Sequence, residues 1–151
     1  MAARQAHNLE VVGSNPTPAT KQQLTVNFLT VNKMQTFRFL QFKVYKDAKK
    51  YFKIILIFSE RIKNYSFKDQ IRRASLSIIL NIAEGSAKRS DIEFARFLEI
   101  SIGSLNEVVA CIDIMKELKK INEKEYNQLI KESEKLAKQL GGFIKKLRVK
   151  C

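Results

Sequence analysis

The chain has 151 residues, of which 45% are hydrophobic and 28% charged, a composition that fits one globular domain and excludes a collagen-like or disordered chain. No apolar run approaches the roughly 18 residues of a membrane span, and no signal-peptide pattern is evident. The net charge of +13 favours an anionic partner such as nucleic acid, although a solvated lysine-rich surface explains it equally well.

The first 33 residues differ from the rest of the chain. They have no helical period and contain both prolines and the single histidine. One interpretation is a disordered tail. The other is a non-native extension, because Gly13–Pro16 can be encoded by bases that match the T-arm of a tRNA gene, and translation would then start at Met34. Residues 1–33 hold three basic residues and one acidic residue, so the domain at 34–151 keeps a net charge of +11.

Two helices are predicted in the first half of the domain. The first spans 43–63, where apolar residues recur every three or four positions. The second spans 66–84. Ser66 and Asp69 have the spacing of a capping box at its start, and Gly85 is expected to end it in the left-handed conformation. Both helices carry more apolar residues than one buried face requires, which suggests contacts between subunits.

Two further helices are predicted in the second half, at 90–119 and 122–148. Each begins with the spacing of a capping box: Ser90 pairs with Glu93 in the first, and Asn122 pairs with Glu125 in the second. The connections between all four helices are short, so neighbouring helices are expected to be antiparallel. The sequence therefore predicts an all-α fold, an antiparallel up-down-up-down four-helix bundle.

A polar stripe interrupts the second predicted helix. The stripe consists of Arg73, Ser77, Asn81 and Glu84. Their spacings of four, four and three residues place them on one face of the helix. They either form a buried network with the third helix, which would fix the register of helices or subunits, or face the channel of a ring. The candidate network residues are Ser77, Asn81, Glu84, Ser101 and Ser104.

The basic residues are candidates for a nucleic-acid interface, because phosphate contacts require only Lys and Arg on a firm surface. The candidates are Arg72, Arg73, Lys88, Arg89, Arg96, Lys131, Lys135, Lys138 and Lys145. For Arg73, pairing with a carboxylate on a neighbouring helix or subunit is the alternative. In the absence of exposed aromatic platforms, we expect binding with little base readout.

We expect no enzymatic activity, no metal and no cofactor. The single histidine, His7, lies in the N-terminal segment, so the predicted bundle has none for a triad or a general base. Metal-ligand spacing, a Glu-x-x-His pair and a glycine-rich phosphate loop are also missing from the sequence. Cys111 among apolar positions and Cys151 at the end form no disulfide framework, which fits a reducing cytoplasm. We expect no membrane partner, because no helix pairs a basic face with exposed large aromatic residues.

Two motifs cover the second and third predicted helices. Gln70–Gly85 has the pattern QxRRAxxSIxxNIAEG, and Phe94–Glu107 has the pattern FxRFLxIxxGSLxE. Together they resemble the 23S rRNA-intervening-sequence protein family, and the resemblance extends over about residues 39–147. It implies a small all-α bundle that often assembles into a ring-like homopentamer. The family is similar to the accessory variability determinant of diversity-generating retroelements, a basic bundle that binds a reverse transcriptase and nucleic acid.

Charge and resemblance together predict a cytoplasmic, non-enzymatic bundle that homo-oligomerises, as a pentameric ring, and binds nucleic acid, in particular RNA. The alternative is an oligomeric protein-interaction scaffold, such as an accessory partner of the reverse transcriptase in a diversity-generating retroelement.

Overall fold

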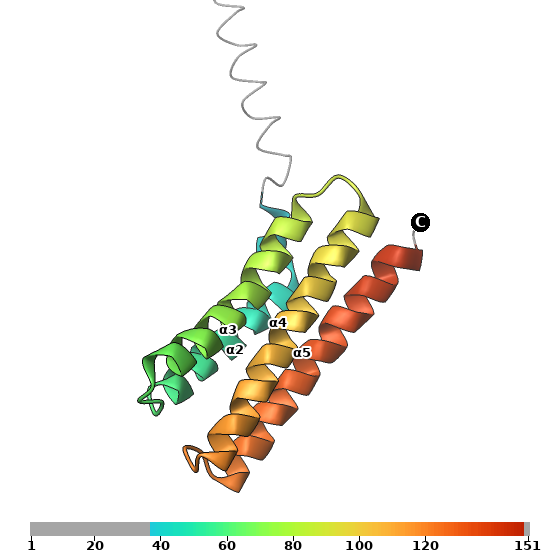
Figure 1. Cartoon of the computed structure of the whole chain (residues 1–151). Helices are drawn as coiled ribbons and strands as arrows, with labels where there is room; N and C mark the ends of the chain where they lie inside the picture. The colour runs from blue at the N-terminus through green and yellow to red at the C-terminus, as the bar shows by residue number, and fades with distance from the viewer. Residues whose placement is uncertain (1–36, 150–151) are drawn as a thin grey trace, which may run out of the picture. The chain divides into compact units, whose positions relative to one another are not determined.

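The computed structural model describes residues 37–149. In this part of the chain a short 3-10 helix, η1, precedes four α-helices, and no residue lies in a strand. The bounds are Arg38–Gln41 for η1, Lys43–Ser59 for α2, Tyr65–Ser86 for α3, Asp91–Glu117 for α4 and Glu123–Val149 for α5. Consecutive α-helices run in opposite directions (Figure 1). The predicted all-α four-helix bundle is confirmed, whereas the prediction for residues 1–33 lies outside the described part.

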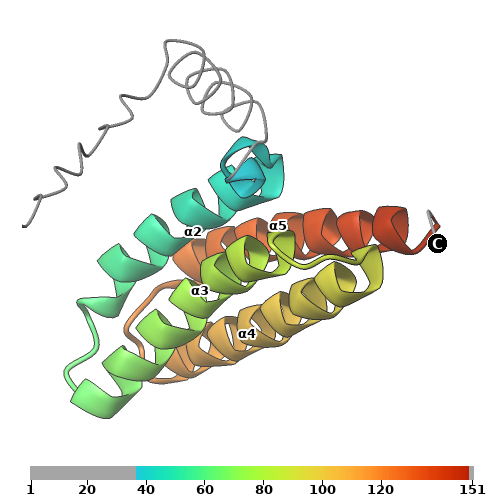
Figure 2. The same ribbon diagram turned by 90° about the horizontal axis from the view of Figure 1, so that it is seen from above.

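The four α-helices surround a common core. Contacts join α2 to α3, α3 to α4, α4 to α5, and α5 back to α2. Figure 2 shows α3 lying between α2 and α4. The short helix η1 packs on α2 and α3, where Arg38 Nε donates a hydrogen bond of 2.8 Å to Ser86 O. The chain order of the helices therefore matches their spatial order around the bundle.

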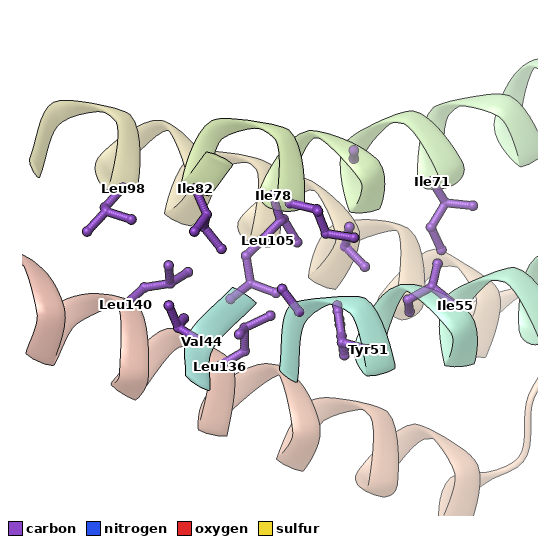
Figure 3. Packing of buried hydrophobic residues seen from close by; sticks show 14 of the residues in the cluster. Val44, Tyr51, Ile55, Ile71, Ile78, Ile82, Leu98, Leu105, Leu136 and Leu140 are labelled. Atoms are coloured by element: carbon purple, nitrogen blue, oxygen red, sulfur yellow. The ribbon is translucent and has the colours of Figure 1, made fainter. Parts of the chain in front are cut away.

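The core draws on every α-helix. Ile55 of α2, Ile78 of α3, Leu105 of α4 and Leu140 of α5 are almost completely buried and converge between the helices (Figure 3). Burying each such side chain stabilises the fold by roughly 1.5–3 kcal/mol. Tyr51 is buried among them, and its hydroxyl lies 2.6 Å from Ser133 Oγ on α5.

Of the three predicted capping boxes, the one at Asn122 forms with both of its hydrogen bonds, and the one at Ser90 forms only the bond of the cap residue. Ser90 Oγ accepts from the backbone N–H of Glu93 at 3.2 Å. At the start of α5, Asn122 Oδ1 accepts from Glu125 N at 2.9 Å, and Glu125 Oε2 accepts from Asn122 N at 3.0 Å. Each box supplies acceptors to backbone N–H groups that have no partner inside the helix.

The predicted start of α3 at Ser66 was wrong. The cap is Asn64, whose Oδ1 accepts from Phe67 N at 2.9 Å, and the helix begins at Tyr65. Asn64 stands three residues before Phe67, so it reaches the same kind of N–H group that Ser66 was expected to reach two residues later.

The predicted role of Gly85 was also wrong. Gly85 lies inside α3, which continues to Ser86, and no described glycine has a positive φ. The described left-handed residue is Lys119, with φ of 52°, just after α4. The position requires glycine for a different reason. A Cβ atom on Gly85 would lie 2.6 Å from Phe97 Cβ and 2.7 Å from Phe94 Cδ2. The glycine lets α3 and α4 approach beside their connecting loop.

Candidate nucleic-acid interface

Charge is segregated between the two halves of the bundle. Helix α2 carries five lysines and one aspartate, and α5 carries seven basic and four acidic residues, so this pair has a net charge of +7. Helix α3 carries three basic and two acidic residues, and α4 two basic and six acidic, so the other pair has a net charge of −3. The basic surface of the described domain is therefore the α2/α5 side.

Arg72 and Arg73 do not form part of that surface. Arg72 Nε donates to Ser59 Oγ at 2.8 Å, and the guanidinium also pairs with Glu60. These bonds tie α3 to the end of α2. Arg73 is exposed, and its Nη1 lies 3.6 Å from Asp69 Oδ2 on the same helix. A carboxylate thus already accompanies each arginine.

Lys88, Arg89 and Arg96 lie at the opposite end of α3 from Arg72. The 16 residues between Arg72 and Lys88 correspond to about 24 Å along a helix, so the predicted arginine and lysine group is split in two. Lys88 Nζ lies 3.2 Å from Glu84 Oε1 and 4.5 Å from the centre of the Phe97 ring. Arg89 and Arg96 are exposed and form no ion pair with a described residue.

The lysines predicted on α5 do lie on the basic side. Lys131 and Lys145 are exposed and have no ion-pair partner among residues 37–149. Lys135 pairs with Glu132 at 2.5 Å, and Lys138 approaches Glu134 only to 3.9 Å. Exposed ion pairs of this kind contribute little to stability, so these amines are available to an anionic ligand.

A partly buried carboxylate organises the seam between α2 and α5. Asp47 Oδ2 accepts from Lys43 Nζ at 2.5 Å and from Gln139 Nε2 at 3.1 Å, and Lys50 Nζ lies 3.4 Å from Oδ1. The hydrogen bond from Lys43 is the main cause that lowers the pKa of Asp47 below its ordinary value. The other amide atom of Gln139, Oε1, is buried and has no hydrogen-bond partner in the described part.

Two hollows lie on this seam, and both are lined by Lys43 and Gln139. The first, of about 290 Å³, also borders Asp47, Lys50, Glu132 and Lys135. The second, of about 470 Å³, is the aromatic hollow, lined by Phe42, Lys43, Gln139, Gly142, Phe143 and Lys146 among others. The sequence did not reveal this site, because its residues come from two helices that are far apart in the chain. The five lysines of α2 were the available signal.

The predicted polar network forms in part. Ser77 Oγ and Ser104 Oγ share a hydrogen bond of 2.8 Å between α3 and α4, and Asn81 Nδ2 donates to Ser77 Oγ at 3.0 Å. Ser101 joins the two helices separately, by donating to Ile78 O at 3.2 Å. Glu84 is not a member: it is exposed, and Lys88 is its partner.

Residues 41–142 match the 23S rRNA-intervening sequence protein family. The chain belongs to this family. No curated protein matches it significantly. A crystal structure of a protein of unknown function from the S23 ribosomal protein family of Bacteroides thetaiotaomicron VPI-5482 has a similar fold, with a TM-score of 0.64 and 23% sequence identity over 68% of this chain and 98% of that one.

This member of the 23S rRNA-intervening sequence protein family also exposes four large apolar side chains on one face of α4 and at its C-cap, with the exposed Arg96 and Glu107 between them. These four residues are called the apolar row. The row contains Ile92, Ile100, Ile114 and Leu118, each about half exposed. Gly103 lies within it, and a Cβ atom there would meet nothing within 4 Å. The sequence indicated excess apolar surface on the first two helices, where Ile57 of α2 and Leu76 and Leu80 of α3 are exposed. The exposed apolar residues of α4 come in addition to these and were not predicted.

Among residues 37–149, no three His, Cys, Asp or Glu side chains come close enough to hold a metal ion. None of the helices described combines the length and the hydropathy that crossing a bilayer requires.

Proposed function

We propose that the chain is a non-enzymatic, homo-oligomeric cytoplasmic protein that binds nucleic acid through phosphate contacts on its α2/α5 side. The observation that supports this is the net charge of +7 on two neighbouring helices beside −3 on the other two. A polyanion is attracted more strongly to the first pair than to the second, so charge orients the encounter. RNA is the first nucleic acid to test, because the family is named for an intervening sequence of 23S rRNA.

Two triple variants with equal changes in net charge test where the contacts are. The first carries Lys131→Gln, Lys138→Gln and Lys145→Gln on the basic side. The second, its control, carries Arg73→Gln, Arg89→Gln and Arg96→Gln on and beside α3 and α4. All six side chains are exposed, so neither variant removes a buried contact.

The measurement is the Kd for a labelled single-stranded RNA at several salt concentrations. Each lost phosphate contact lowers the slope of log Kd against log salt by about 0.7. We expect the slope of log Kd against log salt to fall by about 2 in the α5 variant. In the control variant the slope should stay close to that of the parent protein. Equal losses in both variants would contradict the proposed location, and a parent Kd that does not change with salt would contradict phosphate binding altogether.

A second candidate function is supported by the apolar row on α4. Half-exposed isoleucines on one helix face are typical of a protein interface, which fits both self-association, as the pentameric ring that the resemblance implies, and an accessory role beside a reverse transcriptase. Ile100→Lys and Ile114→Lys should lower the mass that light scattering measures. A monomeric parent would contradict self-association, and failure to capture a reverse transcriptase encoded beside the gene would contradict the accessory role.

A further inference from the structure

The aromatic hollow combines two chemistries that rarely adjoin on a surface. Phe42 and Phe143 form its apolar wall, with ring centroids 5.3 Å apart and planes at 90°. Lys43 and Lys146 stand at its edge, and the side chain of Lys43 is largely exposed. An apolar wall beside two amines suits a ligand that is flat and apolar at one end and anionic at the other.

A glycine keeps the hollow open. Gly142 lines it from the interior of α5, and a Cβ atom at this position would meet nothing within 4 Å. No close approach inside the chain therefore requires a glycine here, although glycine weakens a helix relative to alanine. A side chain at this position would project over the mouth of the hollow.

Gln139, which lines the hollow, carries an unsatisfied acceptor that is buried. Gln139 uses Nε2 to bond Asp47, which fixes the orientation of its amide, and Oε1 is left buried without a partner. A buried acceptor without a donor is unfavourable, and a ligand that brings an N–H group relieves it. Each of the four nucleobases carries at least one such N–H group.

We propose that the aromatic hollow binds one unpaired nucleobase of an RNA strand, with the adjoining phosphates on Lys43 and Lys146. The inference rests on the proposed nucleic-acid function and adds that the protein recognises single strands. The base packs against the wall of Phe42 and Phe143, and a rotation of the Gln139 side chain brings its buried Oε1 to a base N–H group. In a duplex the bases are stacked and paired, so only an unpaired base enters.

Two glycine variants separate this inference from simple charge attraction. Gly142→Leu fills the mouth of the aromatic hollow. Gly141→Leu is the matched control, because Gly141 is also exposed in α5 with open space around it but does not line the hollow. Both changes replace a helix glycine by a good helix former, so both variants should fold at least as stably as the parent.

The probes are a labelled single-stranded RNA, a strand of equal length and charge whose central positions lack bases, and an RNA duplex. We expect the parent and Gly141→Leu to bind the intact strand about tenfold more tightly than the abasic strand, the order of effect of one stacked base. Gly142→Leu and Gln139→Leu should bind both strands equally, with the salt dependence of the parent. Binding of the duplex, which offers no unpaired base, should be the same for the parent and for Gly142→Leu.

The outcomes distinguish nucleobase binding in the hollow from phosphate binding by the basic side. If the parent binds intact and abasic strands equally, the nucleobase inference is overturned while phosphate binding stands. If neither strand binds, the proposed function itself is wrong. If Gly142→Leu affects binding to anionic phosphatidylserine vesicles but not to RNA, the hollow takes a lipid instead, which also overturns the inference.

Discussion

A Cβ atom on Gly85 would lie 2.6 Å from the Cβ atom of Phe97, closer than two such carbon atoms pack. The neighbour is the rigid base of a side chain on α4, so it cannot rotate away. We therefore expect Gly85→Ala to lower the free energy of unfolding by about 1–3 kcal/mol, the usual cost of overpacking, although alanine favours helix. Urea denaturation monitored by circular dichroism measures this difference.

Gly103→Ala is the control for that prediction. Gly103 is also inside a helix, but a Cβ atom there meets nothing within 4 Å. We expect this variant to be more stable by up to about 1 kcal/mol, the difference in helix propensity. If both substitutions changed stability in the same direction, the contact with Phe97 would not explain the glycine in α3.

Tyr51 should make stability depend on pH in the alkaline range. Burial raises the pKa of Tyr51 to about 12, whereas the pKa in the unfolded chain is about 10. Above the lower value the unfolded chain loses the proton and the folded chain keeps it, so rising pH favours unfolding. As the pH rises from the lower to the higher of these pKa values, the contribution of Tyr51 to the free energy of unfolding falls by about 2–3 kcal/mol.

Comparison with Tyr51→Phe isolates this effect, because all other groups titrate in both proteins. The parent should be the more stable one near neutral pH, since the Tyr51 hydroxyl bonds Ser133 Oγ at 2.6 Å. That advantage should shrink as urea unfolding is repeated at pH values from about 9 to about 12. Parallel pH profiles would show that the Tyr51 hydroxyl is accessible to water in the folded state.

Lys119 occupies a backbone conformation that glycine adopts more easily. Its φ is 52°, and Lys120 N donates to Met115 O at 2.8 Å across it, which is the hydrogen bond of a Schellman motif. We expect Lys119→Gly to raise the free energy of unfolding by about 1 kcal/mol. Lys119→Ala, which removes the charge but keeps Cβ, should not. An equal gain in both variants would attribute the effect to charge.

Cys111 should be protected from thiol reagents. It is buried, and burial, with a smaller contribution from the charge of Glu107, raises the pKa of its thiol. In a Cys151→Ser background, we expect modification of the native protein to be at least about 100-fold slower than in urea, because the thiolate is the reactive species. Comparable rates in both conditions would mean that α4 opens readily at this position.

The elements that the sequence predicted well depend on neighbours in the chain. The cap residues Ser90 and Asn122 were predicted correctly because their partners are three residues away. The start of α3 was misplaced because Asn64 and Ser66 both suit a cap, and local spacing does not choose between them. The reason for Gly85 lies on another helix, and no pattern inside α3 contains it.

In the candidate interface, too, the features visible in the sequence lie on one helix, and those that were missed join two helices. The lysines of α5 were found because they recur on one helix face. The partners of Arg72, which are Ser59 and Glu60, become visible only when α2 lies beside α3. The aromatic hollow required knowledge that α2 and α5, the first and last α-helices, are neighbours.

The opposite signs of the two helix pairs, +7 for α2 and α5 and −3 for α3 and α4, make the protein a strong electric dipole. Because the whole chain is strongly basic, with a net charge of +13, it should be retained by a cation exchanger at neutral pH, with the α2/α5 side turned toward the resin. Near a long polyanion, the protein should bind with its α2/α5 side facing the polyanion. If the protein binds RNA as proposed, many copies on one strand would all turn α4 away from the strand, so that its half-exposed isoleucines face the surroundings and are free to meet other proteins.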